Sequence, residues 1–208
     1  MQVVVMCKAP VEGKVKTRLM THYSAAEAKA WHEAMATTVV ARAQRVFSDV
    51  YVAVDDVTHP FFAAWDVPLL PQGAGDLGER MVRVMRGLGE GSLMFLGTDS
   101  PHMQEQRLRE AERSVQEVDV VLGAVEDGGY DLIAMRTPDA AMFSDIDWGS
   151  ARVLQQSVAR AASLGLSYRV LDASFDVDTP DMLARAWAEG WQPDGLALSG
   201  QSHRPLSS

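Results

Sequence analysis

The chain has 208 residues, 47% of them hydrophobic, which is enough for one domain with a sizeable core. Its formal charge of −9 argues against general binding to nucleic acid or anionic membranes, which requires a broad basic face. The single cysteine excludes an internal disulfide and a thiolate zinc cluster. Because there is neither a signal-peptide pattern nor an apolar run near the roughly 20 residues of a membrane span, we expect a cytoplasmic protein.

Short apolar runs alternate with helical patterns along the chain. In chain order they predict a strand at 2–7, a helix from the Ser24 cap to about 47, a strand at 49–54, a helix at 77–87, a strand at 92–97, a helix at 103–115, strands at 119–125 and 130–135, a helix from the Ser150 cap to 165, a strand at 168–171 and a helix from the Thr179 cap to 190.

This alternation predicts an α/β fold, a three-layer α/β/α sandwich with a mostly parallel central sheet. We expect a single domain over 1–191, because no linker divides it, and a poorly ordered tail over 192–208, which is rich in Gly, Ser and Pro. In open sheets of this kind, ligands bind beyond the carboxyl ends of the strands. The polar motifs of the chain stand in those positions.

The first motif is a basic loop after the first predicted strand. Three of the four lysines, Lys8, Lys14 and Lys16, lie within nine residues, and Arg18 follows them. In an acidic protein this cluster indicates a bound anion, most simply a di- or triphosphate, with Gly13 allowing close approach of the backbone. It is not a P-loop, since the Gly-x-x-x-x-Gly-Lys-Ser/Thr pattern is absent. The alternative is a solvated charged loop.

Carboxylates follow two other strands. Asp99 comes directly after the most apolar strand, and Asp176 and Asp178 form an Asp-x-Asp pair after the last strand. Oxygen ligands of this kind suit Mg²⁺ or Mn²⁺, and a metal there could bridge phosphates. The alternative is that these residues cap the helices that follow.

Two further loops contain residues that could bind or activate an acceptor substrate. Glu126 and Asp127 precede Gly128 and Gly129, a pattern that predicts a tight hairpin turn into the strand that starts at Tyr130. Either carboxylate is a candidate to position or deprotonate an acceptor. Trp148, close to Ser150 in an acidic loop, could stack on a sugar or anchor the loop.

The segment 72–80 contains Gly-x-Gly-x-x-Gly, the pattern of dinucleotide-binding turns. That pattern belongs in the first strand–helix turn, and here this turn is the lysine loop, so we do not expect NAD binding. A loop that packs on a nucleotide base or sugar fits better, with candidates Gln72, Gly75, Gly78 and Arg80. An ordinary flexible loop is the alternative.

Six motifs occur in an order that resembles one family. They are Lys8-Ala-Pro with Lys16-Thr-Arg-Leu, Gly75-Asp-Leu-Gly-Glu-Arg80, Gly97-Thr-Asp-Ser-Pro101, Glu126-Asp-Gly-Gly-Tyr130, Trp148-Gly-Ser150 and Asp176-Val-Asp-Thr-Pro180. They resemble the bacterial glycosyltransferase-like family linked to arsenosugar biosynthesis, in the nucleotide-diphospho-sugar transferase superfamily with its GT-A type of fold. The chain is similar, more distantly, to the 2-phospho-L-lactate guanylyltransferases.

The resemblance implies a nucleotide bound by the lysine loop and the 72–80 loop, and a divalent metal at Asp99 with Asp176 or Asp178. It implies glycosyl transfer from an NDP-sugar to a small-molecule acceptor. One departure bears on the donor: the usual Asp-x-Asp after the central strand is here Thr98-Asp99-Ser100, with one carboxylate. That form resembles nucleotidyltransferases, which use an NTP and release pyrophosphate. A nucleotide-binding module without turnover is the third alternative.

Overall fold

The structure is a computed structural model that describes residues 1–198. Its strands are β1 (Gln2–Cys7), β2 (Val50–Val54), β3 (Leu69–Pro71), β4 (Leu93–Leu96), β5 (Val120–Val125), β6 (Tyr130–Met135) and β7 (Tyr168–Ser174). Its α-helices are α1 (Ala25–Val46), α2 (Leu77–Arg86), α3 (Glu105–Glu117), α4 (Val153–Ser163) and α5 (Pro180–Ala188). Short 3₁₀ helices are η1 (Thr17–Thr21), η2 (Pro60–Ala64) and η3 (Ala140–Phe143).

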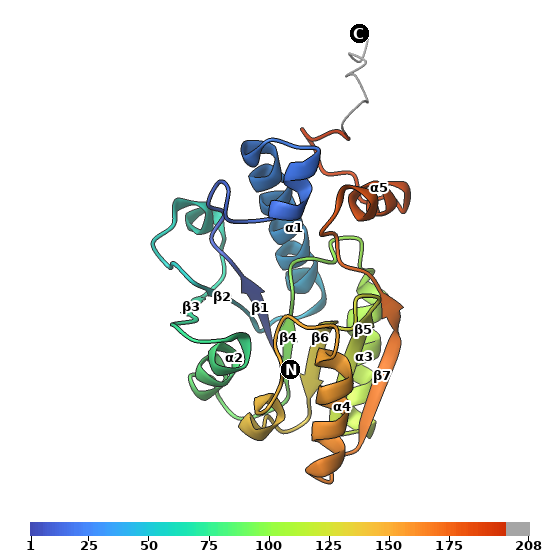
Figure 1. Cartoon of the computed structure of the whole chain (residues 1–208). Coiled ribbons are helices and arrows are strands. Elements are labelled where there is room, and N and C mark those ends of the chain that lie inside the picture. Colours follow the sequence, from blue (N-terminus) through green and yellow to red (C-terminus); the bar gives the residue numbers. More distant parts are fainter. Residues whose placement is uncertain (199–208) are drawn as a thin grey trace.

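Within the described residues the strands form one seven-stranded sheet in the order β3-β2-β1-β4-β6-β5-β7 (Figure 1). All neighbouring strands pair in parallel except β6, which is antiparallel to both β4 and β5. The antiparallel pairing of β5 and β6 follows from the predicted hairpin turn at Gly128 and Gly129. The chain runs from β1 outward to β3 and then returns to β4 on the other side of β1. The gap between β1 and β4 is therefore a topological switch point.

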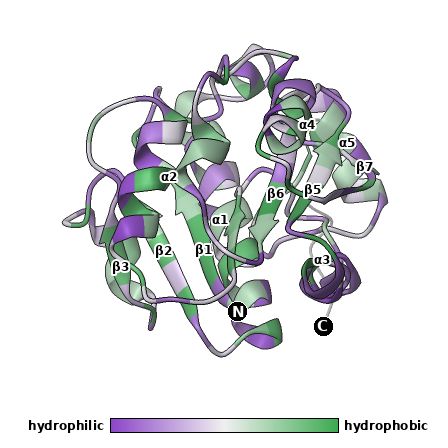
Figure 2. Cartoon of the chain, turned by 90° about the horizontal axis from the view of Figure 1, so that it is seen from below, coloured by the Kyte–Doolittle hydropathy of each residue, from purple (hydrophilic) through white to green (hydrophobic). Residues whose placement is uncertain are grey.

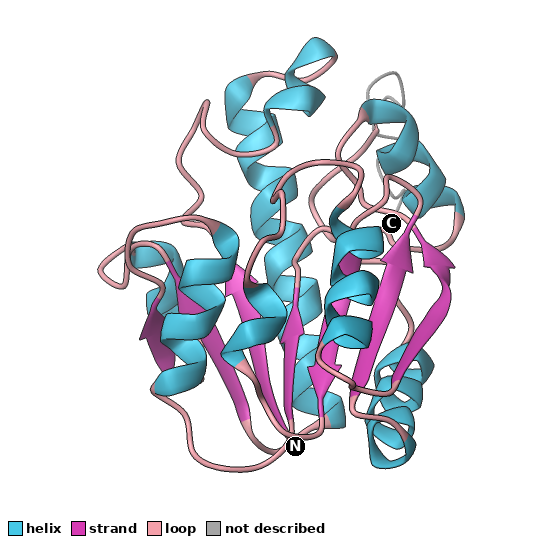
Figure 3. Cartoon of the chain, turned by 60° about the horizontal axis from the view of Figure 1, so that its bottom comes forward, coloured by secondary structure: helices cyan, strands magenta, loops and turns pink. Residues whose placement is uncertain are grey.

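Helices cover both faces of the sheet, so the predicted three-layer α/β/α architecture is confirmed (Figure 3). One face of the strands packs against α1 and α3, and the other packs against α2, η3 and α4. The two faces of β1 show this directly, since Val3 and Val5 belong to the first core and Val4 to the second. Figure 2 shows hydrophobic residues along the strands and hydrophilic residues over much of α3. No helix in residues 1–198 combines the length and apolar character needed to cross a membrane.

Several boundaries differ from the predicted ones. The strand 69–71 was not predicted. Pro68 precedes it and Pro71 is its last residue, and it forms an edge of the sheet, where a missing N–H is tolerated. The helix predicted from Ser150 begins only at Val153, because Ser150 accepts a hydrogen bond from the Arg152 N–H in a turn that precedes the helix. The helix predicted at 103–115 is shifted to α3, Glu105–Glu117.

A third apolar cluster joins the start of α1 to the end of the chain. Trp31 is 1% exposed and meets the rings of Tyr23, Trp187 and Trp191, with ring centroids about 6 Å apart. The capping box of Ser24 and Glu27 begins α1 as predicted and so orients Trp31. Of the predicted tail 192–208, residues 199–208 lie outside the described part, while Leu196 is partly buried against this cluster.

A stack of side chains fixes the loop that leaves β7. The Phe175 ring lies between the His102 imidazole, 3.8 Å away and nearly parallel, and the Arg185 guanidinium, 3.8 Å from the ring centroid. His102 comes from the loop after β4 and Arg185 from α5. The loop with Asp176 and Asp178 is therefore held from two sides, directly before the two carboxylates.

We predict that Trp31→Ala lowers the free energy of unfolding by roughly 3–5 kcal/mol, because it removes the centre of a buried aromatic cluster. Urea denaturation of both proteins measures this. Tyr168→Ala, at a 42% exposed position on β7, is the matched control and should change stability little. Equal effects of the two substitutions would contradict the assignment of Trp31 to a core.

A second prediction concerns acid sensitivity. Burial lowers the pKa of His102 to about 4, helped by the charges of Arg185 and other arginines and opposed by that of Glu189. The folded state thus binds fewer protons than the unfolded state between about pH 6.5 and 4, so stability falls as the pH falls through that window, by about 3 kcal/mol at most.

Urea titrations of the wild type and His102→Gln at pH 7.5 and 4.5 measure how much His102 contributes to the pH dependence of the free energy of unfolding. The wild type should lose more stability between these values than the variant does. The matched control, His22→Gln at an exposed position, should behave like the wild type. An identical loss in wild type and His102→Gln would contradict the prediction.

Candidate functional site

The candidate site lies where the loops after β1, β4 and β7 meet, at the switch point of the sheet. Although β6 and β5 separate β4 from β7 in the sheet, the loop after β7 crosses back and the Val177 N–H donates to the Asp99 carbonyl oxygen at 2.7 Å. Ser100 Oγ lies 2.9 Å from the Phe175 carbonyl oxygen and 2.8 Å from Asp176 Oδ1. These bonds hold the two carboxylate loops side by side.

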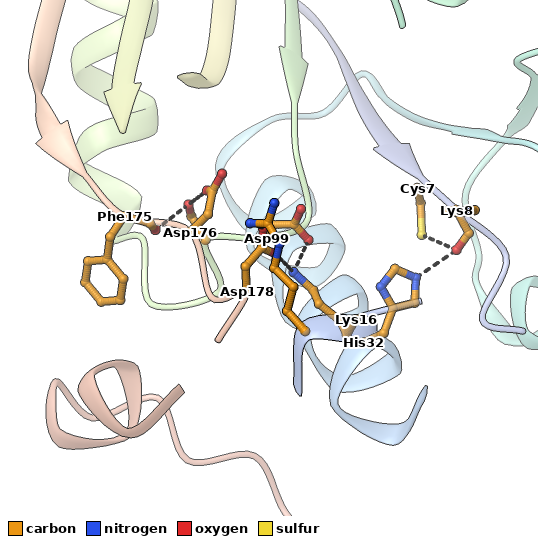
Figure 4. A network of polar contacts seen from close by, with 10 residues as sticks. Cys7, Lys8, Lys16, His32, Asp99, Phe175, Asp176 and Asp178 are labelled. Carbon is orange, nitrogen blue, oxygen red and sulfur yellow. Dashed lines mark hydrogen bonds and ion pairs between the residues drawn. The ribbon is translucent and has the colours of Figure 1, made fainter. Parts of the chain in front are cut away.

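The centre of the site is the ammonium group of Lys16 (Figure 4). Its Nζ lies 2.6 Å from Asp99 Oδ1 and 2.8 Å from Asp178 Oδ1, and the side chain is 4% exposed. The backbone of Lys16 is left-handed, with φ 46° and ψ 41°, a conformation that non-glycine residues seldom adopt. The strain is maintained because the buried ammonium makes charge-assisted bonds to two partly exposed carboxylates.

These ion pairs determine the protonation states of the site. Burial lowers the pKa of Lys16, but the two carboxylates outweigh it and raise the pKa overall. Burial raises the pKa of Asp99, and Lys16 outweighs it and lowers the pKa overall. Asp176 differs: burial and the charges of Asp99 and Asp127 raise its pKa to about 7.

The predicted metal ligands Asp99, Asp176 and Asp178 all bind other groups of the protein. The point between Asp99 and Asp178 is filled by the Lys16 ammonium, and Asp176 is hydrogen-bonded to Ser100. In residues 1–198 no group of three or more His, Cys, Asp or Glu side chains is placed to hold a metal ion. In the arrangement described, the three carboxylates are therefore engaged by an ammonium and a hydroxyl group.

The basic loop lines a cavity of about 480 Å³ beside β1 and β4. Lys8, Lys14, Lys16 and Arg18 all line it, together with His32 and Leu77. Gly13 has φ 74°, which allows the loop to turn back so that the Lys8 Nζ donates to the Lys14 carbonyl oxygen at 3.4 Å. The structure thus brings together the four predicted basic residues around one cavity.

A second cavity, of about 520 Å³, adjoins the first. The two share a wall that includes Arg18, Asp99 and Asp178. Of the predicted acceptor residues, Gly129, Tyr130, Trp148 and Ser150 line this second cavity. Gly128 does not; its φ of 89° and its close approach to Ala151, where a Cβ would lie 2.1 Å from the carbonyl oxygen, give it a structural role in the turn.

The two candidate bases are separated. Asp127 lines the second cavity, and its Oδ1 accepts from the Gly129 N–H at 3.0 Å. Glu126 points to α5 instead, where both of its carboxylate oxygens accept from Arg185 Nη1 at 2.9 and 2.8 Å. Neighbours in sequence thus face different surroundings, and only Asp127 is available to an acceptor.

The 72–80 segment makes mostly internal contacts. Gln72 is buried and its amide donates to the carbonyl oxygens of Cys7 and Ala53, which ties β1 to β2. Arg80 Nε donates to the Gly75 carbonyl oxygen at 2.9 Å. Gly78 packs so closely on Trp148 that a Cβ would lie 2.6 Å from the indole nitrogen. None of these four predicted residues lines the basic cavity; Leu77 from this segment does.

Sequence reasoning missed two features of the site. His32 is 4% exposed, lines the basic cavity and donates from Nε2 to the Lys8 carbonyl oxygen at 2.8 Å. Its spacing from Ala28 and Met35 on a helical face was the available signal. Asp131, 3.0 Å from Arg107, lines the second cavity; burial raises its pKa to about 6 although Arg107 opposes this. No local pattern marks that pair.

Several solved structures are similar to the chain. A protein from Desulfovibrio desulfuricans G20, provisionally named a nucleotide-diphospho-sugar transferase, is 28% identical with a TM-score of 0.80, over 86% of this chain and 84% of that one. CMP:2-keto-3-deoxy-manno-octonic acid synthetase in complex with CTP is 15% identical with a TM-score of 0.61, over 90% and 96%.

A third similar structure is 4-diphosphocytidyl-2C-methyl-D-erythritol synthase from Anaerococcus prevotii DSM 20548, at 11% identity and a TM-score of 0.53, over 90% of this chain and 97% of that one. At these low identities, the second and third show a shared fold. None of the curated proteins matches the chain. A family model matches residues 32–150, from the buried histidine of α1 to Ser150 in the lining of the second cavity. The chain belongs to the family described as uncharacterized protein conserved in bacteria, DUF2064.

Proposed function

We propose that this chain transfers a glycosyl group from a nucleotide-diphospho-sugar to a small-molecule acceptor. It is a transferase of the glycosyl- or nucleotidyltransferase kind, in keeping with the nucleotide-sugar and cytidylyl enzymes that share its fold. The observation that carries the proposal is the pair of adjoining cavities, one basic and one acidic, which share Arg18, Asp99 and Asp178. A donor and an acceptor bound there would meet at the shared wall.

The basic cavity suits the diphosphate of the donor. Lys8, Lys14 and Arg18 supply positive charge at its rim, and Lys16 supplies a buried ammonium at its floor. A positive group already held in place, as the Lys16 ammonium is, stabilises the negative charge that develops on the leaving diphosphate without having to reorganise during the reaction. The second cavity then receives the acceptor beside Asp127.

In the reaction, an acceptor oxygen attacks the anomeric carbon of the donor sugar, and the bond from that carbon to the diphosphate oxygen breaks. The acceptor proton passes to the Asp127 carboxylate, and the nucleoside diphosphate leaves with the bonding electron pair. Asp127 is 3.0 Å from the Gly129 N–H, a bond that orients one carboxylate oxygen and leaves the other to take the proton.

The Mg²⁺ or Mn²⁺ expected at Asp99, Asp176 and Asp178 stays a proposal, and no step above depends on it. Those carboxylates would have to release Lys16 and Ser100 before they could surround an ion. Three carboxylates are nevertheless the kind of oxygen ligands that Mg²⁺ and Mn²⁺ prefer. A metal would add positive charge beside the donor phosphates.

Nucleotidyl transfer is the second candidate. In it, an acceptor phosphate attacks the α-phosphorus of an NTP and pyrophosphate leaves, so no general base is required. The single carboxylate of Thr98-Asp99-Ser100, the distant resemblance to guanylyltransferases and the cytidylyltransferase fold support it. The resemblance to the family linked to arsenosugar biosynthesis supports a sugar donor instead.

We predict that one NDP-sugar raises the thermal stability of the purified protein, in a panel of NDP-sugars and NTPs measured with Mn²⁺ and with EDTA. At about 100 times its dissociation constant, the donor adds roughly 2.7 kcal/mol. The shift should be larger with Mn²⁺, and Asp99→Asn should remove that difference. A shift confined to an NTP would favour nucleotidyl transfer, and equal shifts in Mn²⁺ and EDTA would assign the cationic role to Lys16 alone.

A second prediction separates the two candidate bases. Asp127→Asn should lower kcat by about 10²-fold or more, because the variant lacks the carboxylate that takes the proton from the attacking oxygen of the acceptor substrate. Glu126→Gln is the matched control, since Glu126 is paired with Arg185 outside the acceptor cavity, and it should leave kcat nearly unchanged. Steady-state rates of nucleoside diphosphate release measure both. Small, equal losses would count against Asp127 as the base.

A further inference from the structure

The lining of the second cavity bears on the chemical class of the acceptor. We propose that the acceptor is an uncharged or cationic molecule with a hydroxyl or amine nucleophile, and that phosphorylated and carboxylate acceptors are excluded. This inference rests on the proposed function, because it assigns a substrate class to the cavity that adjoins the donor site.

The acceptor cavity is strongly acidic. Of the fifteen residues that line it, five are aspartates and a single one is basic, Arg18. The aspartates are Asp99, Asp127, Asp131, Asp176 and Asp178. Arg18 also lines the basic cavity, so it is available to the donor phosphates as well.

Ion pairs compensate only part of this negative charge. Asp99 and Asp178 share the ammonium of Lys16, and Asp131 pairs with Arg107. For Asp127 and Asp176 the described residues provide no ion pair; they provide the Gly129 N–H and the Ser100 hydroxyl as donors. Asp127 therefore leaves uncompensated negative charge in a half-enclosed space, where repulsion of an anion is screened less than at an open surface. Asp176, whose pKa is raised to about 7, adds to this charge only in its ionised form.

The two cavities differ in the sign of the charge that lines them. The basic cavity has four basic side chains and two aspartates, whereas the acceptor cavity has one basic side chain and five aspartates. An anionic group is therefore attracted to the first cavity and repelled from the second. The same field keeps the released diphosphate out of the acceptor position.

The polar groups of the acceptor cavity also select for hydrogen-bond donors. Ionised carboxylates only accept hydrogen bonds, so the molecule that satisfies them must bring O–H or N–H groups. Trp148 and Leu77 supply an apolar wall against which the carbon face of a ring or short chain can lie. A polyol, sugar or amino sugar has both features, whereas a phosphate has acceptors where donors are needed.

Equilibrium binding to matched compounds tests this. Isothermal titration calorimetry is done with the nucleoside diphosphate of the donor saturating the basic cavity, so that added phosphates cannot bind there. The probes are glycerol and glycerol 3-phosphate, ribose and ribose 5-phosphate, and glucose, glucosamine and glucose 6-phosphate. At least one neutral or cationic probe should bind, and its phosphorylated counterpart should bind at least about tenfold more weakly.

Two variants connect the result to the cavity. Asp127→Asn removes an uncompensated charge, so it should narrow the gap between a neutral probe and its phosphate severalfold. Asp172→Asn, which changes an exposed carboxylate on β7 outside the cavity, is the matched control and should leave the gap unchanged. An unchanged gap in Asp127→Asn would overturn the electrostatic argument.

The other outcomes are equally distinct. Tighter binding of the phosphorylated probes overturns the inference and favours the nucleotidyl alternative. An absence of binding by every neutral and cationic probe also overturns the inference. The titration measures binding of the nucleoside diphosphate before any probe is added. If the nucleoside diphosphate does not bind, the proposed function itself is overturned.

Discussion

The buried ammonium of Lys16 between Asp99 and Asp178 is the interaction on which the site depends. Burying a lysine is costly unless opposite charges compensate it, and here the compensating carboxylates come from the loops after β4 and β7, while the lysine follows β1. One cation therefore joins the loops of the neighbouring strands β1 and β4 to the loop after β7, which β6 and β5 separate from β4 in the sheet. Removal of the lysine would leave two carboxylates without their shared cation, so the three loops depend on this one side chain.

The sheet topology explains why this unit stands between two cavities of opposite charge. β1 and β4 are parallel neighbours at the switch point, so their carboxyl-end loops diverge and leave the basic cavity between them. The antiparallel strand β6 starts at the same edge, since it follows a hairpin turn, and its first residues line the acidic cavity. A wholly parallel sheet would have placed the start of β6 at the opposite edge.

Much of the architecture could be predicted from the sequence, because buried strands and capped helices have strong local patterns. The capping box at Ser24 and the hairpin at Gly128 are examples. The site was only partly predictable. The lysine loop was conspicuous in composition, but nothing local indicates that Lys16 turns inward while Lys14 stays exposed, since that follows from a left-handed backbone and from carboxylates over 80 residues away. Likewise, Glu126 and Asp127 are distinguished only by Arg185 of α5.

Gly78 has a consequence for the breadth of substrates that related chains can use. Its missing side chain lets the indole of Trp148 lie directly against the backbone of α2, and the same indole forms a wall of the acceptor cavity. The residue at position 78 thus acts as a spacer that sets the position of that wall. A larger residue there would press on the indole and on the Phe143 carbonyl oxygen, neither of which is charged, so cavity shape can change in this fold without a change in the charged residues of the site.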